Sequence, residues 1–489
     1  MYKLSEKLDL LMKNRNYTSM KLADYLGMDK STVNQFRTGK RKLRNKSIAE
    51  KISEALQLNH DEHKGLMNAF YSDVMGEYYF RGINAINDIV CNSSWINCPV
   101  AYRITDTSIK MDKSSVVLEG KYNVDKIIGD LLISEGRLAK EVYICESLIN
   151  DDTCAAIEAL CLCEGQARIF HVFSWNDAVN SELDNNMYNI DSLKKLFRLI
   201  TYGKNYKPKY YYSSRSSTMT QGDFISNTLI VGNYVLCYSA NHQYGILIQN
   251  NEELLHMQKK IVMNCYAEAS IFANVLDYPE YLEKVVAILK VSKQKKVRAF
   301  TPGVCMGLIL DERECLLTQH IREDFPEKDI WIQYIHQYLN NIQNLKDNKK
   351  FSGIIFSSLK GMYYTAREGC INEIPRALYN PLSLEERIEF LRKWRMVIKT
   401  YNIAIMDIPE MEEDAFIELY VSPSKALFAI PMPDGEAICI DLEEPGIIEL
   451  ALKYVDFNDE YRQMSPSDVD RKIDSLIEAL KAEIRETAI

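Results

Sequence analysis

The residues with the most distinctive chemistry lie in one short helical stretch near the start of the chain, residues 30–37 (KSTVNQFR). Four polar side chains there are spaced one, three and four residues apart, which places them on one outer face of a helix. They are Lys30, Ser31, Asn34 and Gln35. In the major groove of DNA, lysine donates to guanine, and asparagine or glutamine pairs with adenine. The spacing therefore predicts a face that reads base pairs.

A cluster of cations follows this stretch directly after Gly39. It comprises Lys40, Arg41, Lys42 and Arg44. Charges of this kind bind phosphates and set the position of a protein on the duplex without reading its sequence. The alternative is that the helix face and the loop are ordinary solvated surface. The cationic cluster, the small Ala23 and the two glycines at Gly27 and Gly39 favour DNA binding over that alternative.

Apolar residues at helical spacing predict the helices that position these side chains. The stripe of the first helix is Leu4, Leu8 and Leu11. The second helix is capped by Thr18 or Ser19 and ends at Gly27, because a left-handed glycine closes a helix at low cost. The third is capped by Asp29 and ends at Gly39. A fourth helix, capped by Ser47, completes a pattern that is typical of a helix-turn-helix domain.

Residues 4–58 resemble the Cro/repressor-type (XRE) helix-turn-helix family, because its LA…G…S-T-[VI]…G-K-R pattern is present. The resemblance implies binding to double-stranded DNA through three segments. The implied contact residues are Ser19 at the start of the second helix, Lys30, Ser31, Asn34 and Gln35 in the third, and Thr38, Lys40 and Arg41 in the phosphate-binding loop.

One position departs from the family pattern. The family commonly pairs an arginine of the first helix with a glutamate two residues before the loop glycine, whereas this chain has Met12 and Arg37 there. Both members of the pair have changed, so no buried carboxylate is left without its partner. We expect the Arg37 stem to lie over Met12, with its guanidinium in solvent or near a phosphate.

The charge of the chain is unevenly distributed. Residues 1–50 contain twelve Lys and Arg against five Asp and Glu, a balance of +7. The whole chain has a net charge of −9, so the remaining 439 residues carry −16. A cationic end on an acidic body is the distribution expected when only the first module meets a polyanion.

Length and composition limit the class of protein. A chain of 489 residues is too long for one hydrophobic core and predicts several domains. No apolar run approaches the ~20 residues needed to cross a bilayer. The polar N-terminus does not read as a secretory signal. Twelve cysteines without a CxxC pair indicate reduced thiols. We therefore expect a cytoplasmic protein with no membrane partner, no metal site and no cofactor.

The predicted fold is multidomain, with an all-α helix-turn-helix head followed by a mixed α/β effector region, for which two similar units are one of the open alternatives. Strand-like runs such as residues 141–146 and 168–174 support the α/β assignment. The expected divisions are a DNA-binding domain at 1–60, a helical linker at 61–90, an α/β sensor region at 91–277 and a second α/β region with a C-terminal helix at 278–489.

Particular segments carry more specific predictions. Residues 228–248 read as a hairpin and residues 252–276 as a long helix, and a similar order recurs at 416–454. That recurrence suggests an internal duplication. Residues 306–310 (MGLIL) read as a strand. The tyrosines and lysines of residues 204–215 have two interpretations, a second nucleic-acid surface or an edge strand protected by lysines.

The long second part of the chain contains no familiar catalytic pattern. HExxH, GxSxG, a Gly-rich phosphate loop and an HxK run followed by Asp are all missing from the sequence. A phospholipase-D-like fold without catalytic residues stays open. Ser357, Ser358 and Lys360 lie close enough in sequence to form a Ser–Lys dyad, but spacing alone is weak support. We therefore predict that the chain is not an enzyme.

These observations predict a transcriptional regulator that reads a short operator. Such proteins usually bind as dimers, because half-sites one helical turn apart match a two-fold axis. We expect a homodimer, and an unknown small molecule or protein as the effector of the α/β region. The alternative is an enzyme or toxin-like effector with an autoregulatory DNA-binding head. A peptide sensor with an all-helical repeat body is disfavoured by the hairpin at 228–248.

Overall fold

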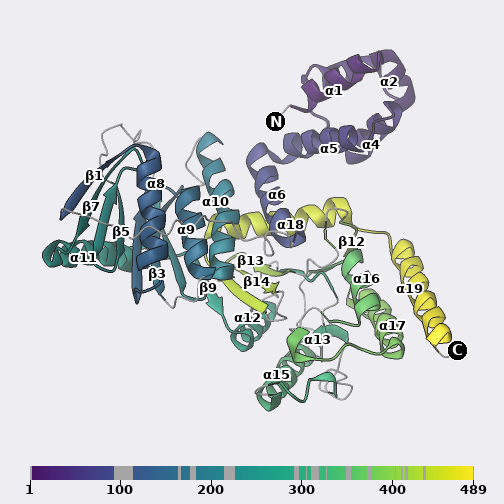
Figure 1. Cartoon of the computed structure of the whole chain (residues 1–489). Coiled ribbons are helices and arrows are strands. Elements are labelled where there is room, and N and C mark those ends of the chain that lie inside the picture. The colour runs from purple at the N-terminus through teal and green to yellow at the C-terminus, as the bar shows by residue number, and fades with distance from the viewer. Residues whose placement is uncertain are drawn as a thin grey trace. The chain divides into compact units, whose positions relative to one another are not determined.

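The computed structural model (Figure 1) divides into two compact units, Met1–Asn84 and Ala85–Ile489. The described residues are 3–92, 114–162, 167–176, 183–213, 226–290, 297–303, 306–309, 319–325, 328–347, 354–371, 376–401, 403–408, 411–412, 417–432 and 437–487. Within these ranges, none of the helices combines the length and the apolar character needed to cross a bilayer.

The described part of the first unit is helical. Its helices are α1 (Leu4–Asn14), α2 (Ser19–Leu26), α3 (Lys30–Arg37), α4 (Lys46–Ala55), α5 (His60–Met75) and α6 (Glu77–Cys91), of which α6 continues into the second unit. The apolar faces of α1 to α5 form one core that includes Leu8, Leu22, Val33, Ile52 and Phe70. The cap of α4 differs from the prediction, because the side chain of Asn45 accepts the Ser47 N–H at 2.9 Å.

The second unit begins with an eight-stranded mixed sheet in the order β1-β7-β6-β5-β2-β3-β4-β8. Its strands are β1 (Ser115–Glu119), β2 (Glu141–Glu146), β3 (Arg168–Asn176), β4 (Tyr206–Ser213), β5 (Asn227–Val231), β6 (Tyr234–Tyr238), β7 (Tyr244–Gln249) and β8 (Ser270–Ile271). Strands β2, β3 and β4 run parallel, while β5, β6, β7 and β1 form an antiparallel ribbon beside β2.

Helices cover this first sheet. They are α8 (Lys121–Asp130), the π-helix η1 (Leu131–Glu135), α9 (Asp151–Leu162), α10 (Leu183–Tyr202) and α11 (Glu252–Glu268). Figure 1 shows α8, α9 and α10 side by side, as their mutual contacts require. Helix α11 packs on the sheet face that carries Tyr143 and Ile230, with Val262 buried against them.

A second mixed sheet follows in the order β12-β11-β10-β13-β14-β15-β9. Its strands are β9 (Ala273–Leu276), β10 (Arg298–Phe300), β11 (Ile354–Ser358), β12 (Ala404–Met406), β13 (Glu418–Ser422), β14 (Lys425–Pro431) and β15 (Ala437–Leu442). Its helices are α12 (Tyr278–Lys290), α13 (Met306–Ile309), α15 (Lys328–Asp347), α16 (Leu359–Glu368), η4 (Arg376–Leu378), α17 (Leu384–Tyr401), α18 (Pro445–Arg462) and α19 (Pro466–Thr487).

The two sheets repeat one topology. Strands β10, β11 and β12 run parallel like β2, β3 and β4, and β13, β14, β15 and β9 form the antiparallel ribbon in the place of β5, β6, β7 and β1. Helix α18 follows the ribbon as α11 does. The mixed α/β prediction is therefore confirmed, and the second α/β region repeats the strand order of the first.

Three segments differ from their predicted structure. The helix predicted over 252–276 ends at Glu268, because the residues after it pair as β8 with β4 and as β9 with β15. The predicted strand at 306–310 contains the helix α13, and residue 310 lies outside the described ranges. A short apolar run fits either state, and tertiary packing decides between them. The predicted two-stranded hairpin has three strands, because Gly232, at a φ of 56°, turns the chain between β5 and β6.

Candidate nucleic-acid interface

The ends of α2 are set by its capping residues. The Thr18 hydroxyl oxygen accepts the Lys21 N–H at 3.2 Å, which satisfies a free donor of the first turn. Gly27 has a φ of 64° and donates its N–H to the carbonyls of Ala23 and Asp24. Residues 27–29 then form a three-residue turn into α3. Asp29 is the N-cap residue of α3, as predicted, although its side chain makes no capping hydrogen bond.

Helix α3 has one buried and one exposed face. Val33 and Phe36 are buried in the core of the first unit. The predicted base-reading residues Lys30, Ser31, Asn34 and Gln35 are all exposed. The structure therefore places these four side chains on the surface, opposite the residues that anchor the helix.

The loop after α3 is held close to the helical core. Gly39 has a φ of 71°, and a Cβ there would lie 3.1 Å from the Ser5 hydroxyl, so this turn requires glycine. The Arg41 N–H donates to the Gln35 carbonyl at 3.2 Å. Leu43 is buried and anchors the end of the loop. These contacts define the backbone that presents the cations.

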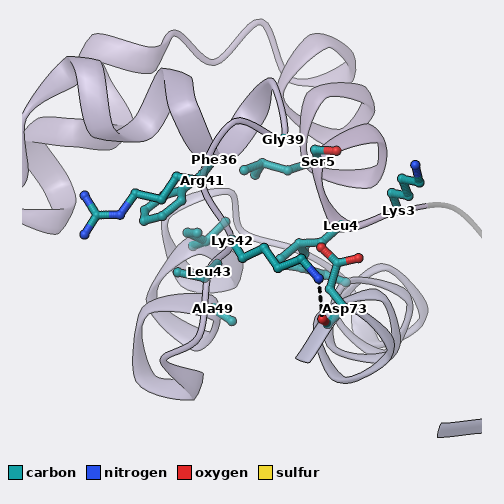
Figure 2. Close-up of a pocket in the computed structure, with 13 residues that line it drawn as sticks. Lys3, Leu4, Ser5, Phe36, Gly39, Arg41, Lys42, Leu43, Ala49 and Asp73 are labelled. Atoms are coloured by element: carbon teal, nitrogen blue, oxygen red, sulfur yellow. Dashed lines mark hydrogen bonds between the residues drawn. The ribbon is translucent and has the colours of Figure 1, made fainter. Parts of the chain in front are cut away.

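The loop cations have different surroundings, which Figure 2 shows. The Arg41 guanidinium carbon lies 5.8 Å from the centre of the Phe36 ring, and Arg41 lines a small cavity together with Leu43 and Ala49, with its guanidinium end pointing outward. The Lys42 ammonium instead donates to the Asp73 carbonyl at 3.4 Å. Within the described residues, no ion pair is formed by Lys30, Lys40, Arg41 or Arg44. These four charges are available to a polyanion.

The side chain of Arg37 corrects the expectation for this position. Its Nε donates to Asp9 Oδ1 at 2.5 Å, and its Nη1 donates to the Ser19 hydroxyl at 3.3 Å. The guanidinium is therefore bound within the unit, while the side chain stays 34% exposed. Asp9 precedes Met12 by three residues, so both lie on one face of α1. The link between α1 and α3 has the carboxylate and the arginine exchanged relative to the family pattern.

This link changes the expected role of Ser19. Its side chain is only 6% exposed, and its hydroxyl oxygen accepts a hydrogen bond from Arg37. The hydroxyl thus orders the start of α2 against α3. A contact of Ser19 with a phosphate would have to use its backbone N–H, which is one of the free donors at the N-terminus of a helix.

The Asp9–Arg37 link predicts a pH-dependent contribution to stability. Hydrogen bonds from Lys13 and then Arg37 hold the pKa of Asp9 below its ordinary value. A carboxyl with a lowered pKa stabilises the fold above its unfolded-state pKa, and this contribution disappears as the pH falls through the folded-state pKa. At pH 7, Asp9→Asn should lower the local stability of α1–α3 by about 0.5–1 kcal/mol, and the difference should shrink below about pH 4.

Hydrogen exchange of the α1–α3 amides in the full chain would measure this effect. Asp24→Asn is a suitable control, because Asp24 is exposed on α2 and forms no ion pair within the described residues. An equal loss of protection at pH 3 and pH 7 would contradict the assignment of the effect to ionised Asp9.

Two candidate segments of the second unit take part in its packing. In the tyrosine- and lysine-rich segment, Tyr206 and Tyr210 are buried, whereas Tyr211 and Tyr212 are exposed. The predicted edge strand is wrong, because β4 pairs with β3 on one side and with β8 on the other. The Ser358 hydroxyl donates to the Pro302 carbonyl and accepts the Gly361 N–H, both at 2.9 Å, so it caps α16. Arg215, at the end of the tyrosine- and lysine-rich segment, lies outside the described ranges.

Comparisons with known proteins give only distant likenesses. No family model matches the chain, and no curated protein matches it. The chain is similar to phosphatidylserine synthase of Haemophilus influenzae Rd KW20, with 12% identity and a TM-score of 0.22 over 77% of this chain and 94% of that one. It is also similar to TrmBL2, an archaeal chromatin protein with a novel mode of DNA binding, with 10% identity and a TM-score of 0.21 over 55% and 99%. Both TM-scores are below 0.5, so neither likeness establishes a fold or a function.

Proposed function

We propose that this protein is a sequence-specific DNA-binding transcriptional regulator and that its first unit is a helix-turn-helix head of the XRE type. The observation that carries the proposal is the exposed polar face of α3 beside a cationic loop whose backbone is held by the core. An ordinary solvated surface requires neither the glycine at position 39 nor the buried anchor Leu43.

The dimensions of α3 suit this role. A helix of eight residues is about 12 Å long, close to the width of the major groove. With Val33 and Phe36 held in the core, the opposite face enters the groove. Lys30 and Gln35 then act as the main base-reading residues, toward guanine and adenine respectively. Ser31 and Asn34 complete the contact face.

Phosphate contacts come from the elements on either side of α3. Lys40 and Arg41 provide charges in the loop, and Thr38 precedes them at the end of the helix. The Thr38 hydroxyl and backbone N–H both donate to the Asn34 carbonyl and end α3, so a phosphate contact requires the hydroxyl to rotate away from Asn34. The N-terminus of α2, at Ser19, supplies backbone donors of the kind that bind anions. The protein binds as a homodimer to half-sites about 34 Å apart.

The phosphate contacts predict a change in salt dependence. Replacing Lys40 or Arg41 with alanine should reduce the slope of log K against log salt by about 0.9 for each phosphate that the protein no longer neutralises, because fewer counterions are released. Fluorescence anisotropy with labelled operator at several salt concentrations measures this slope. Lys64→Ala is the control, because Lys64 is an exposed cation of α5 and belongs neither to α3 nor to the loop after it. A slope equal to that of the unmodified protein would reject the phosphate contact.

The function itself is tested by selecting DNA from a random pool with the full-length protein at near-physiological salt. The expected result is one enriched motif with two-fold symmetry, because a dimer presents two copies of α3. A pool without an enriched motif would contradict sequence-specific binding. An enriched motif without symmetry would support sequence-specific DNA binding and contradict binding as a homodimer.

A further inference from the structure

A groove of about 520 Å³ lies between α16 and α19 in the second α/β region. Leu359 and Lys360, in the first turn of α16, follow β11 directly, and Asp407 follows β12. Strands β11 and β12 run parallel. The groove therefore lies outside the carboxyl ends of a parallel pair, which is where open α/β sheets bind their ligands.

The first turn of α16 is rigidly held, so this side of the groove is already formed. The Ser358 hydroxyl bonds both the Pro302 carbonyl and the Gly361 N–H. Gly361 packs so closely on Pro302 that a Cβ at this position would lie 1.8 Å from the carbonyl oxygen. A largely preformed wall is typical of small-molecule sites.

Helix α19 provides the other wall, and the described residues of the first α/β region show no equivalent of it after α11. After α11, which is the counterpart of α18, the chain enters the short strand β8 directly. Helix α19 is joined to α17 by ion pairs, including one of 3.0 Å between Lys399 and Asp470. The second region has thus added one helix that closes a crevice at the ligand-binding edge of its sheet.

The lining of the groove is mainly apolar. Leu359, Leu476 and Leu480 provide aliphatic surface, and Tyr363 is 37% exposed. The small side chains of Ala366 and Ala479 leave space between the two helices. An exposed aromatic ring between aliphatic side chains favours a flat ligand with an aromatic body.

The charged residues of the groove disfavour an ionic ligand. Lys360 and Arg367 carry positive charge, while Asp407 and Glu483 carry negative charge, so the charges at the rim of the groove sum to zero. The Lys360 ammonium donates to the Met411 carbonyl, and Arg367 pairs with Glu368 at 2.8 Å. Both cations are therefore already bonded within the protein and do not offer a free anion site.

We propose that the groove between α16 and α19 binds an uncharged aromatic small molecule, with the ring beside Tyr363 and the leucines. Its use as the effector site of a regulator rests on the proposed function, whereas the binding itself does not. The ligand contacts two helices. Helix α16 belongs to the general α/β topology, and α19 is added to it.

The test uses the full-length chain and N-phenyl-1-naphthylamine, an uncharged aromatic dye that fluoresces in apolar surroundings. We expect a saturable increase in fluorescence. Ala479→Phe should weaken dye binding about tenfold by filling the groove, which corresponds to about 1.4 kcal/mol. The matched control is Ala482→Phe, because residue 482 is exposed on the same helix and does not line the groove. Equal affinity of the two variants, or no saturation, would overturn the proposal.

Two further measurements exclude other occupants. The anionic dye 8-anilinonaphthalene-1-sulfonate should bind more weakly than the uncharged dye, and stronger binding that Ala479→Phe abolishes would overturn the ligand class. Light scattering should show the same mass for both phenylalanine variants. A change of mass in Ala479→Phe alone would identify the groove as a protein contact and reject the proposal. These experiments contain no DNA, so their failure is distinct from failure of DNA binding.

Discussion

Alanine at Lys30 or Gln35 is expected to weaken binding to the selected operator by about 1–3 kcal/mol for each side chain and to relax the preference for the base pair that it reads. Both side chains are exposed on the face of α3 opposite Val33 and Phe36. Removing one leaves the core intact, so the weaker binding would come from the missing base contacts. Anisotropy titrations with the selected operator and with single-base variants measure affinity and preference together.

The control for this prediction is Lys51→Ala, which removes an exposed cation from α4 without changing α3. It should leave the base preference unchanged. If Lys30→Ala and Gln35→Ala weakened binding equally on every sequence, these residues would contact phosphates only. If neither variant changed affinity or preference, α3 would not be the recognition helix.

Gly361→Ala is expected to destabilise the second α/β region by about 3 kcal/mol or more. The new Cβ would lie 1.8 Å from the Pro302 carbonyl oxygen and 2.8 Å from the Gly303 nitrogen, and both are backbone atoms that a rotamer change does not move. Relief requires α16 to separate from the chain after β10, which breaks the two hydrogen bonds that the Ser358 N–H and hydroxyl donate to the Pro302 carbonyl. Overpacking of this kind lowers the free energy of unfolding by an amount at the upper end of the range for single substitutions.

Urea unfolding of the full chain, followed by tryptophan fluorescence, measures this destabilisation, because Trp394 is fully buried in the neighbouring helix α17. Gly65→Ala is a suitable control. A Cβ there would meet only the flexible end of the Lys7 side chain at 3.1 Å, and alanine favours the helix. Equal unfolding curves for Gly361→Ala and the unmodified protein would show that the contact with Pro302 relaxes easily.

Much of the structure of the first unit could be predicted from local sequence patterns. The stripes that contain Leu4, Leu22 and Val33 all face one core, as their helical spacing predicted. Gly27 ends α2 in the left-handed conformation, as predicted, and Ser383 and Glu386 form a capping box of the same local kind at the start of α17. These features were predictable because a cap or a stripe involves residues only a few positions apart.

Long-range contacts account for what the patterns did not predict in the candidate interface. Arg37 binds Asp9 and Ser19, which precede it by 28 and 18 residues. The available signal was the position of Asp9 one helical turn before Met12, but helical spacing does not show which helix packs against which face. The burial of the Ser19 hydroxyl could not be predicted for the same reason. The start of a helix becomes buried only when another helix covers it.

The amino-acid sequence alone determined the helices of the first unit, the shared face of Lys30 and Gln35, and the mixed α/β character of the second unit, because caps and hydrophobic periods act locally. Only the tertiary structure decided the exchanged Asp9–Arg37 link, the end of α11 at Glu268 and the groove beside α19. The physical reason is that strand pairing and helix packing join residues far apart in the chain, and their free energy can override local preference.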